Sequence, residues 1–203
     1  TAVGDEAGTA LTTGDQNTIL GYSAGVALTT GLRNTLLGST AGDALVGAER
    51  NTAVGYGALH TETEGDRSTA VGVFALSTQN TTGGGNIYNT AVGYGAGNAV
   101  TTGLENTLIG GLAGDAITSA SYNTFIGSNS GTAAITGNQN VSVGAYSQRF
   151  NTEGSKNVSV GYSALENLNL STATDSFNTA VGHKAGEAVT TGVQNTLIGG
   201  LAG

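Results

Sequence analysis

The chain has 203 residues, of which 35 are Gly and none is Pro, Met, Cys or Trp, and its net charge is −8. Without Cys it has no disulfide framework, no thiolate metal site and no cysteine nucleophile. The negative charge repels phosphate backbones, which argues against a nucleic-acid partner. No apolar run approaches about 18 residues, so we expect no membrane insertion by this segment.

One motif fills nearly the whole sequence. The unit from Asn89 to Glu105 reads NTAVGYGAGNAVTTGLE and starts again at Asn106, and we number its positions p1 (the Asn) to p17. Copies follow each other at 17 residues, except for two steps of 21 residues. A fixed short period is the signature of a solenoid. We therefore predict a single all-β domain over residues 1–203, a parallel β-solenoid of about 12 turns.

A longer repeat overlies the short one. Residues 90–114 and 179–203 agree at 20 of 25 positions, which gives a super-repeat of 89 residues. Neither end carries the atypical capping repeat that solenoids need for solubility. We therefore predict that the chain is a window of a longer fibre and continues end to end into its neighbouring segments.

The first strand of each turn is predicted at p1 to p4. Frequent Gly opposes a helix, at about 1 kcal/mol for each Gly, and Gly is not at every third residue as collagen requires. Because p4 is always Val, Ile or Leu, we expect p2 and p4 to line the interior, with Val54 directly below Val71. Position p3 then faces outward and forms an apolar stripe that marks an interface between chains. The predicted interchain residues are Ile19, Leu36, Leu108, Phe125 and Leu197.

Two positions that recur in nearly every copy of the repeat predict its corners and a side-chain ladder. Asn at p1 bonds locally to the backbone and tolerates a left-handed conformation, and stacked Asn amides can form a ladder. Gly at p5 supplies backbone geometry that a Cβ forbids. The ladder residues are Asn17, Asn34, Asn51, Asn89, Asn106, Asn123, Asn140, Asn157, Asn178 and Asn195. The corner residues are Gly21, Gly38, Gly55, Gly72, Gly93, Gly110, Gly127, Gly144, Gly161, Gly182 and Gly199.

The second half of each turn is less explicit. Position p8 is Ala or Ser, which lets two sheets approach closely, and a second strand is expected between p8 and p13. Alternation does not decide whether p10 and p12 or p11 and p13 are buried. The four extra residues of each long turn fall within 77–88 and 166–177, where we expect loops on one side of the rod. At about 4.8 Å per turn the rod would be roughly 55 Å long.

The repeats resemble a known family. The stretches NVSVGAYS at 140–147 and NVSVGYSA at 157–164 resemble the head repeats of trimeric autotransporter adhesins, and the NTAVGY form also resembles repeats of bacteriophage tail fibres. This resemblance covers all twelve turns and implies a left-handed parallel β-roll, three chains side by side, and no catalytic residue. The turn is longer here than in the adhesin head repeat, so an outer corner must differ.

Two columns of side chains are candidate glycan contacts. Arg33, Arg50 and Arg67 occupy p17 of consecutive turns, next to acidic residues at p16, so a charge-balanced solvated edge is the alternative to an anionic-sugar site. Tyr22, Tyr56, Tyr94 and Tyr162 occupy p6, where they suit either corner packing or a platform for sugars. Thr-Thr pairs such as Thr101-Thr102 suggest an ice-binding array, although the array is interrupted.

Repetition without a cleft predicts a structural protein rather than an enzyme. Catalytic carboxylates need a cleft that sets their pKa values, and the two His have no metal-ligand spacing. We expect no enzyme activity and no cofactor. The leading hypothesis is a structural and adhesive rod of an extracellular fibre, on a cell surface or a virion, assembled as a homotrimer and contacting a host glycan or receptor. The alternatives are a glycan- or ice-binding module and a tailspike-like polysaccharide-degrading protein.

Overall fold

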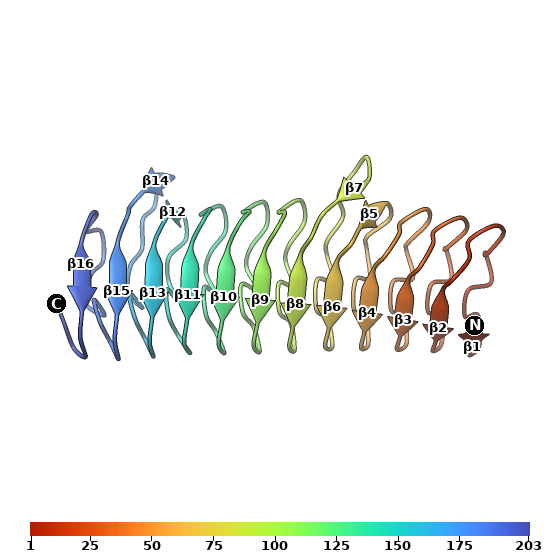
Figure 1. Ribbon diagram of the computed structural model, residues 1–203, viewed down its shortest axis with the longest axis horizontal. Helices are drawn as coiled ribbons and strands as arrows, with labels where there is room; N and C mark the ends of the chain where they lie inside the picture. The colour runs from red at the N-terminus through yellow and green to blue at the C-terminus, as the bar shows by residue number, and fades with distance from the viewer.

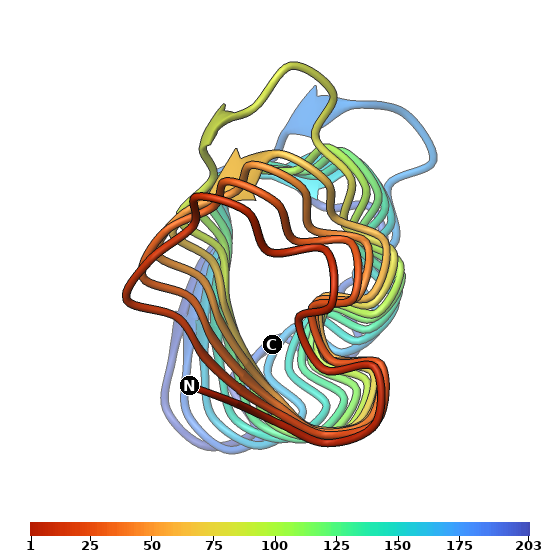
Figure 2. The ribbon, with the colours of Figure 1, turned by 90° about the vertical axis from the view of Figure 1, so that its right-hand side faces the viewer.

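The chain is a straight coil of stacked turns. The computed structural model describes all residues 1–203 and contains strands and turns but no helix. Successive turns lie side by side from the N-terminal to the C-terminal end (Figure 1). Seen from the N-terminal end, the chain winds anticlockwise as it recedes, which is a left-handed coil (Figure 2). The predicted parallel β-solenoid of about 12 turns is confirmed.

One parallel sheet of 12 short strands runs along the rod. Its strands are β1 (Ala2–Val3), β2 (Thr18–Leu20), β3 (Thr35–Leu37), β4 (Thr52–Val54), β6 (Thr69–Val71), β8 (Thr90–Val92), β9 (Thr107–Ile109), β10 (Thr124–Ile126), β11 (Val141–Val143), β13 (Val158–Val160), β15 (Thr179–Val181) and β16 (Thr196–Ile198). Each covers p2 to p4 of one turn, and β1 only p3 and p4. The register never slips, and Val54 pairs with Val71 as predicted. Equivalent side chains therefore stack into columns along the rod.

The second strand expected between p8 and p13 does not form. Outside the main sheet there are only two short parallel pairs, β5 (Gly65–Asp66) with β7 (Gly85–Asn86) and β12 (Gly154–Ser155) with β14 (Thr174–Asp175). Positive φ angles, as at Gly97 (59°), turn the backbone before a strand can develop. Hydrogen bonds between turns nevertheless continue outside the strands, as from the N–H of Gly97 to the carbonyl of Ala113 at 2.9 Å. A Pro at any of these donor positions would remove a bond between turns, which is consistent with the lack of Pro in the chain.

The predicted orientation of the main strand is wrong. Position p3 faces the core, whereas p2 and p4 face outward. Of the predicted interchain residues, Ile19, Leu36, Leu108 and Phe125 are buried, and Leu197 in the last turn is half-buried against the core. These side chains hold the turns of one chain together and are not available to another chain.

The space opposite p3 explains this orientation. Position p9 lies across the core from p3, and its size is complementary. A Cβ on Gly25 would lie 2.7 Å from Leu36 Cδ1, so a large p3 residue requires Gly at p9. Where p3 is Ala, as at Ala70, buried Leu59 and Leu76 fill the space. Alternation along a three-residue strand separates two faces, but only this volume match tells which face is inside.

The apolar core is divided by a polar segment. A cluster of 22 buried hydrophobic residues extends from Ile19 to Ala134, and a second cluster of 5 begins at Leu165. Between them the p3 and p8 columns carry Ser, and Ser147 Oγ donates to Ser159 Oγ at 2.6 Å. These hydroxyls replace apolar packing with hydrogen bonds, which satisfies the buried polar groups.

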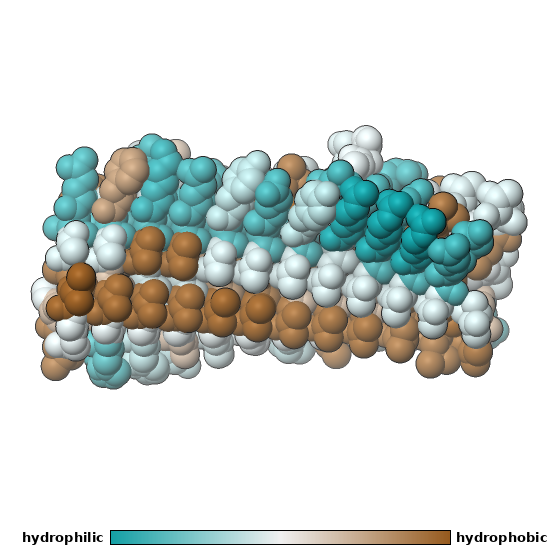
Figure 3. All heavy atoms as spheres, in the orientation of Figure 1, coloured by the Kyte–Doolittle hydropathy of each residue, from teal (hydrophilic) through white to brown (hydrophobic).

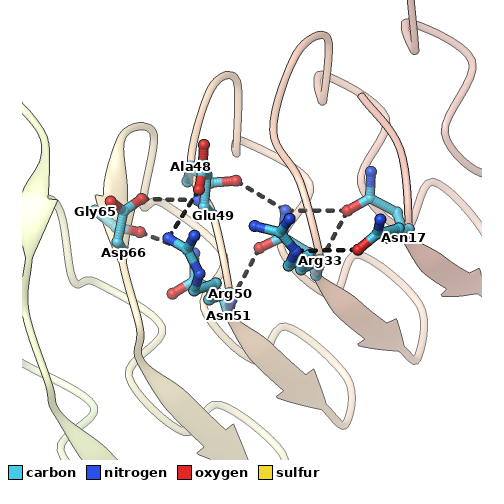
Figure 4. A network of polar contacts seen from close by, with 10 residues as sticks. Asn17, Arg33, Ala48, Glu49, Arg50, Asn51, Gly65 and Asp66 are labelled. Atoms are coloured by element: carbon cyan, nitrogen blue, oxygen red, sulfur yellow. Dashed lines mark hydrogen bonds and ion pairs between the residues drawn. The ribbon is translucent and has the colours of Figure 1, made fainter. Parts of the chain in front are cut away.

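A ladder of Asn side chains runs inside one corner. The backbone N–H of Asn34 donates to Asn17 Oδ1 at 2.8 Å, and Asn34 Nδ2 donates to the carbonyl of Ala48 at 2.8 Å (Figure 4). The same pattern recurs along the rod as far as Asn195, except at Ser68, where the Gln79 side chain bridges Ser68 and Asn89. The left-handed backbone expected at Asn lies one residue earlier, because p17 residues such as Arg33 have φ near 60°. The corner therefore starts at the p17 residue with its left-handed backbone, and the amide of the following Asn holds it in place through hydrogen bonds.

The other corner depends on Gly at p5. These residues have φ between 123° and 141°, a region that L side chains rarely adopt. A Cβ on Gly110 would lie 2.6 Å from the carbonyl carbon and oxygen of Gly127 in the next turn. The corner therefore requires Gly both for its own backbone and for the approach of the neighbouring coil.

Candidate functional site

The basic column does not form one positive site. Arg33 Nε donates to Gln16 Oε1 at 3.0 Å, Arg50 pairs with Glu49 at 2.9 Å, and Arg67 lies over the Tyr88 ring at 5.7 Å. Figure 4 shows Arg33 and Arg50 beside the Asn ladder, with Glu49 and Asp66 at the same edge. Each guanidinium therefore has a different kind of partner, and of the three only Arg50 makes an ion pair. An exposed ion pair of this kind contributes little to stability.

The four candidate Tyr residues are exposed but do not form a continuous platform. Tyr162 stacks on His183 with 5.5 Å between ring centroids and 11° between planes. Tyr56 meets the edge of Phe74 at 5.2 Å. Tyr22 and Tyr94 have no aromatic partner. A sugar needs an open ring face to stack on, so the column offers at most separate contacts.

Sequence reasoning missed an aromatic cluster near the C-terminal end. Tyr146 packs edge-on against Tyr162 at 5.8 Å, and the Arg149 guanidinium lies 5.1 Å from the Tyr146 ring. Arg149 also lies 3.7 Å from Glu166. The sequence pattern that could have indicated this cluster is Tyr146 at p7, three residues before Arg149 at p10 of the same turn. The cluster is a cation–π contact closed by an ion pair, so its positive charge is already matched.

The Thr-Thr pairs lie on the surface of the rod. At three pairs the first Thr donates its hydroxyl to the next turn: Thr12 to the carbonyl of Thr29 at 3.2 Å, Thr29 to that of Val46 at 3.2 Å and Thr101 to that of Thr118 at 3.0 Å. These three hydroxyls extend the backbone ladder.

An apolar stripe at p4 is the most continuous feature of the surface. It consists of Val3, Leu20, Leu37, Val54, Val71, Val92, Ile109, Ile126, Val143, Val160, Val181 and Ile198, all half-buried or exposed. Figure 3 shows it as an unbroken band along the whole rod. The p2 residues, mostly Thr, form a second, paler row beside it (Figure 3). An outward-facing apolar stripe therefore exists, but it lies at p4 and not at p3, where it was expected.

Two groups have shifted pKa values. Burial raises the pKa of the Asp115 carboxyl, and its Oδ1 atom has no hydrogen-bond partner. The hydrogen bond to Glu187 raises the pKa of the partly exposed Lys184 amine. Neither group faces a second carboxylate across a cleft, and no set of three or more His, Asp or Glu side chains is placed to hold a metal ion.

No segment of the chain forms a helix long and apolar enough to cross a bilayer. Comparison of the chain with protein-family models, with curated proteins and with solved structures finds no match.

Proposed function

We propose that this chain is a structural rod of a trimeric fibre. The observation that supports this proposal is the apolar stripe, which is twelve turns long and has no partner within the chain. Contiguous apolar surface of this kind marks an interaction site. Together with the p2 row, it runs the whole length of the rod, roughly 55 Å at about 4.8 Å per turn.

The stripe suits self-association better than a compact partner. It is straight and repeats at every turn, so a second copy of the same chain matches it over its full length. A closed ring of identical chains leaves no stripe exposed, and the family that the repeats resemble forms trimers. The p2 Thr residues would lie at the rim, where hydroxyls keep contact with water.

In this proposal the rod works by stiffness and length. In-register hydrogen bonds resist bending at every turn. Such a fibre belongs outside the cell, on a cell surface or on a virion. Contact with a host glycan or receptor would come from corners and loops, because the stripe is covered.

The experiment is a mass measurement in solution. We expect the wild-type chain to have three times the 19.9 kDa mass of a single chain in analytical ultracentrifugation. Ile109→Glu places a charge in the stripe and should give folded monomers. Ile135→Glu is the matched control, because Ile135 is similarly exposed (42% against 37%) but lies outside the stripe. A wild-type chain that is a folded monomer at high micromolar concentration would refute the proposal.

Ice binding is a second candidate for the same face. The hydroxyls of Thr18, Thr35, Thr52, Thr69, Thr90, Thr107, Thr124, Thr179 and Thr196 make no hydrogen bond within the chain, and these residues stand in one column beside the stripe. A regular row of hydroxyls at strand spacing, about 4.8 Å, can order water. If the chain binds ice, it should be a monomer that inhibits ice recrystallisation, and Thr107→Lys should abolish the inhibition. A trimer that does not inhibit ice recrystallisation would exclude this function.

A further inference from the structure

A hollow lies beside the first long turn. The loop that carries β7 stands out from the rod (Figure 1), and a space of about 270 Å³ separates it from the following turn. Thr81, Thr82, Asn86 and Ile87 line it from the loop, and Thr102 and Leu104 line it from the next turn. It is the only pocket on the rod.

Three of the lining side chains have unused hydrogen-bonding groups. Thr82, Asn86 and Thr102 are exposed, and none of their side chains makes a hydrogen bond within the chain. Beneath them, Ile87 is buried and Leu104 is half-buried. The hollow therefore combines free donors and acceptors at its rim with an aliphatic floor, which is the pattern of a small-molecule site.

The loop is held in place from below. Glu62 is fully buried, and its Oε1 accepts the backbone N–H of Gly65 at 2.8 Å while its Oε2 accepts the Thr81 hydroxyl at 2.9 Å. Gln79 Nε2 donates to the same carboxylate at 3.1 Å. This network joins the base of the loop to the preceding turn, so the lining residues are positioned without a ligand.

Three consecutive glycines shape the loop beside the hollow. Gly83, Gly84 and Gly85 all have positive φ, between 70° and 104°. A Cβ on Gly83 or Gly85 would meet no atom within 4 Å, so no neighbouring side chain fills that space. The residues 89 positions later are Thr172, Ala173 and Thr174. The second loop has no such hollow, although it occupies the same place in the super-repeat.

The chemistry of the lining selects a neutral ligand. No lining residue is charged, and hydroxyl and amide groups both donate and accept, as the hydroxyls of a sugar do. Asp66 pairs with Asn86 across β5 and β7, and the chain has a net charge of −8, so an anionic sugar is repelled. The aliphatic floor suits the C–H face of a sugar ring, and the volume admits about one ring.

We propose that this hollow binds one neutral pyranose unit, as a terminal residue of a glycan. The site does not depend on trimer formation. The loop that carries β7 projects above the rest of the rod (Figure 1), whereas the apolar stripe runs along the lower half of the face in the same orientation (Figure 3). Association through the stripe would leave the loop open to solvent.

The test is saturation-transfer NMR on the intact chain with the methyl glycosides of galactose, glucose, mannose and N-acetylglucosamine, and with sialic acid as the anionic probe. We expect at least one neutral glycoside to bind with a Kd on the order of millimolar, the range for a ligand of about a dozen heavy atoms. Thr102→Phe fills the hollow from a residue outside the loop and should reduce binding at least tenfold. Thr191→Phe, at the equivalent position 89 residues later, should bind as the wild type does.

Three results of this experiment would refute the proposal. The proposal is wrong if no neutral glycoside binds, if sialic acid binds more tightly, or if Thr102→Phe and Thr191→Phe bind equally. Asn86→Ala is the second variant should Thr102→Phe fail to fold, since the Asn86 side chain is exposed and makes no hydrogen bond. Sedimentation of the same samples separates failure of this site from failure of the trimer.

Discussion

Removing one amide from the Asn ladder should destabilise the whole rod. Asn123 is fully buried, its Nδ2 donates to the carbonyl of Gly137 at 2.9 Å, and its Oδ1 accepts the backbone N–H of Asn140 at 2.9 Å. No other hydrogen bond satisfies these two buried backbone groups. Asn123→Ala leaves both without a partner, at about 1–3 kcal/mol each. We therefore expect a loss of roughly 3 kcal/mol in the free energy of unfolding.

Thermal unfolding followed by circular dichroism measures this loss. For a chain of this size each kcal/mol corresponds to about 2–4 °C, so the midpoint should fall by roughly 6–12 °C. Asn86→Ala is the control, because an exposed side chain without hydrogen bonds should change stability by less than about 0.5 kcal/mol. If Asn123→Ala melts within 2 °C of that control, the ladder does not stabilise the corner as argued.

Three further substitutions test the interior, a corner and one carboxyl group. Leu108→Asp should prevent folding because it buries an unpaired charge, whereas Ile109→Asp should leave a folded chain by circular dichroism, and the reverse result would restore the rejected orientation. Gly110→Ala should cost about 3 kcal/mol from strain and collision with the next turn, while adjacent Gly111→Ala, which meets no atom, should melt like the wild type. Asp115→Asn should raise the melting temperature at pH 7, because folding raises the pKa of the Asp115 carboxyl and ionisation of that group then destabilises the folded protein as pH increases. At about pH 3 the carboxyl is protonated in both the folded and the unfolded chain, so the gain in melting temperature should disappear. An equal gain at pH 7 and at pH 3 would contradict this prediction.

The period of the sequence determined the architecture but not which side of the strand is buried. Stacking of like residues follows from the spacing alone, as the pairing of Val54 with Val71 illustrates. Invariant branched residues at p4 favoured a buried column, yet they form the outer stripe. The informative pattern was the match between p3 and p9, such as Phe125 opposite Gly131 and Ala70 opposite Leu59. Side chains that share one space must vary together in size, so comparing columns within the sequence would have identified p3 as the core.

The candidate contacts were less predictable because they depend on neighbours in other turns. The sequence placed Arg33, Arg50 and Arg67 in one column, but their separate partners became visible only with the backbone in place. The hollow beside Thr102 required the path of a loop whose glycines leave many conformations open. Left-handed φ angles at p17 were also missed, since residues as different as Arg, Tyr and Phe occupy that position.

In-register stacking has a consequence for how such a protein can change over generations. Every coil meets the one above and the one below through nearly the same contacts, so losing or gaining one copy alters the length by about 4.8 Å and leaves the cross-section unchanged. Unequal exchange between similar gene segments would thus yield proteins that still fold, with reach as the inherited variable. The exception is the segment from Glu62 to Asn89, where Gln79 and Ser68 replace one rung of the ladder, and a cut there would leave a carboxylate buried without its donors.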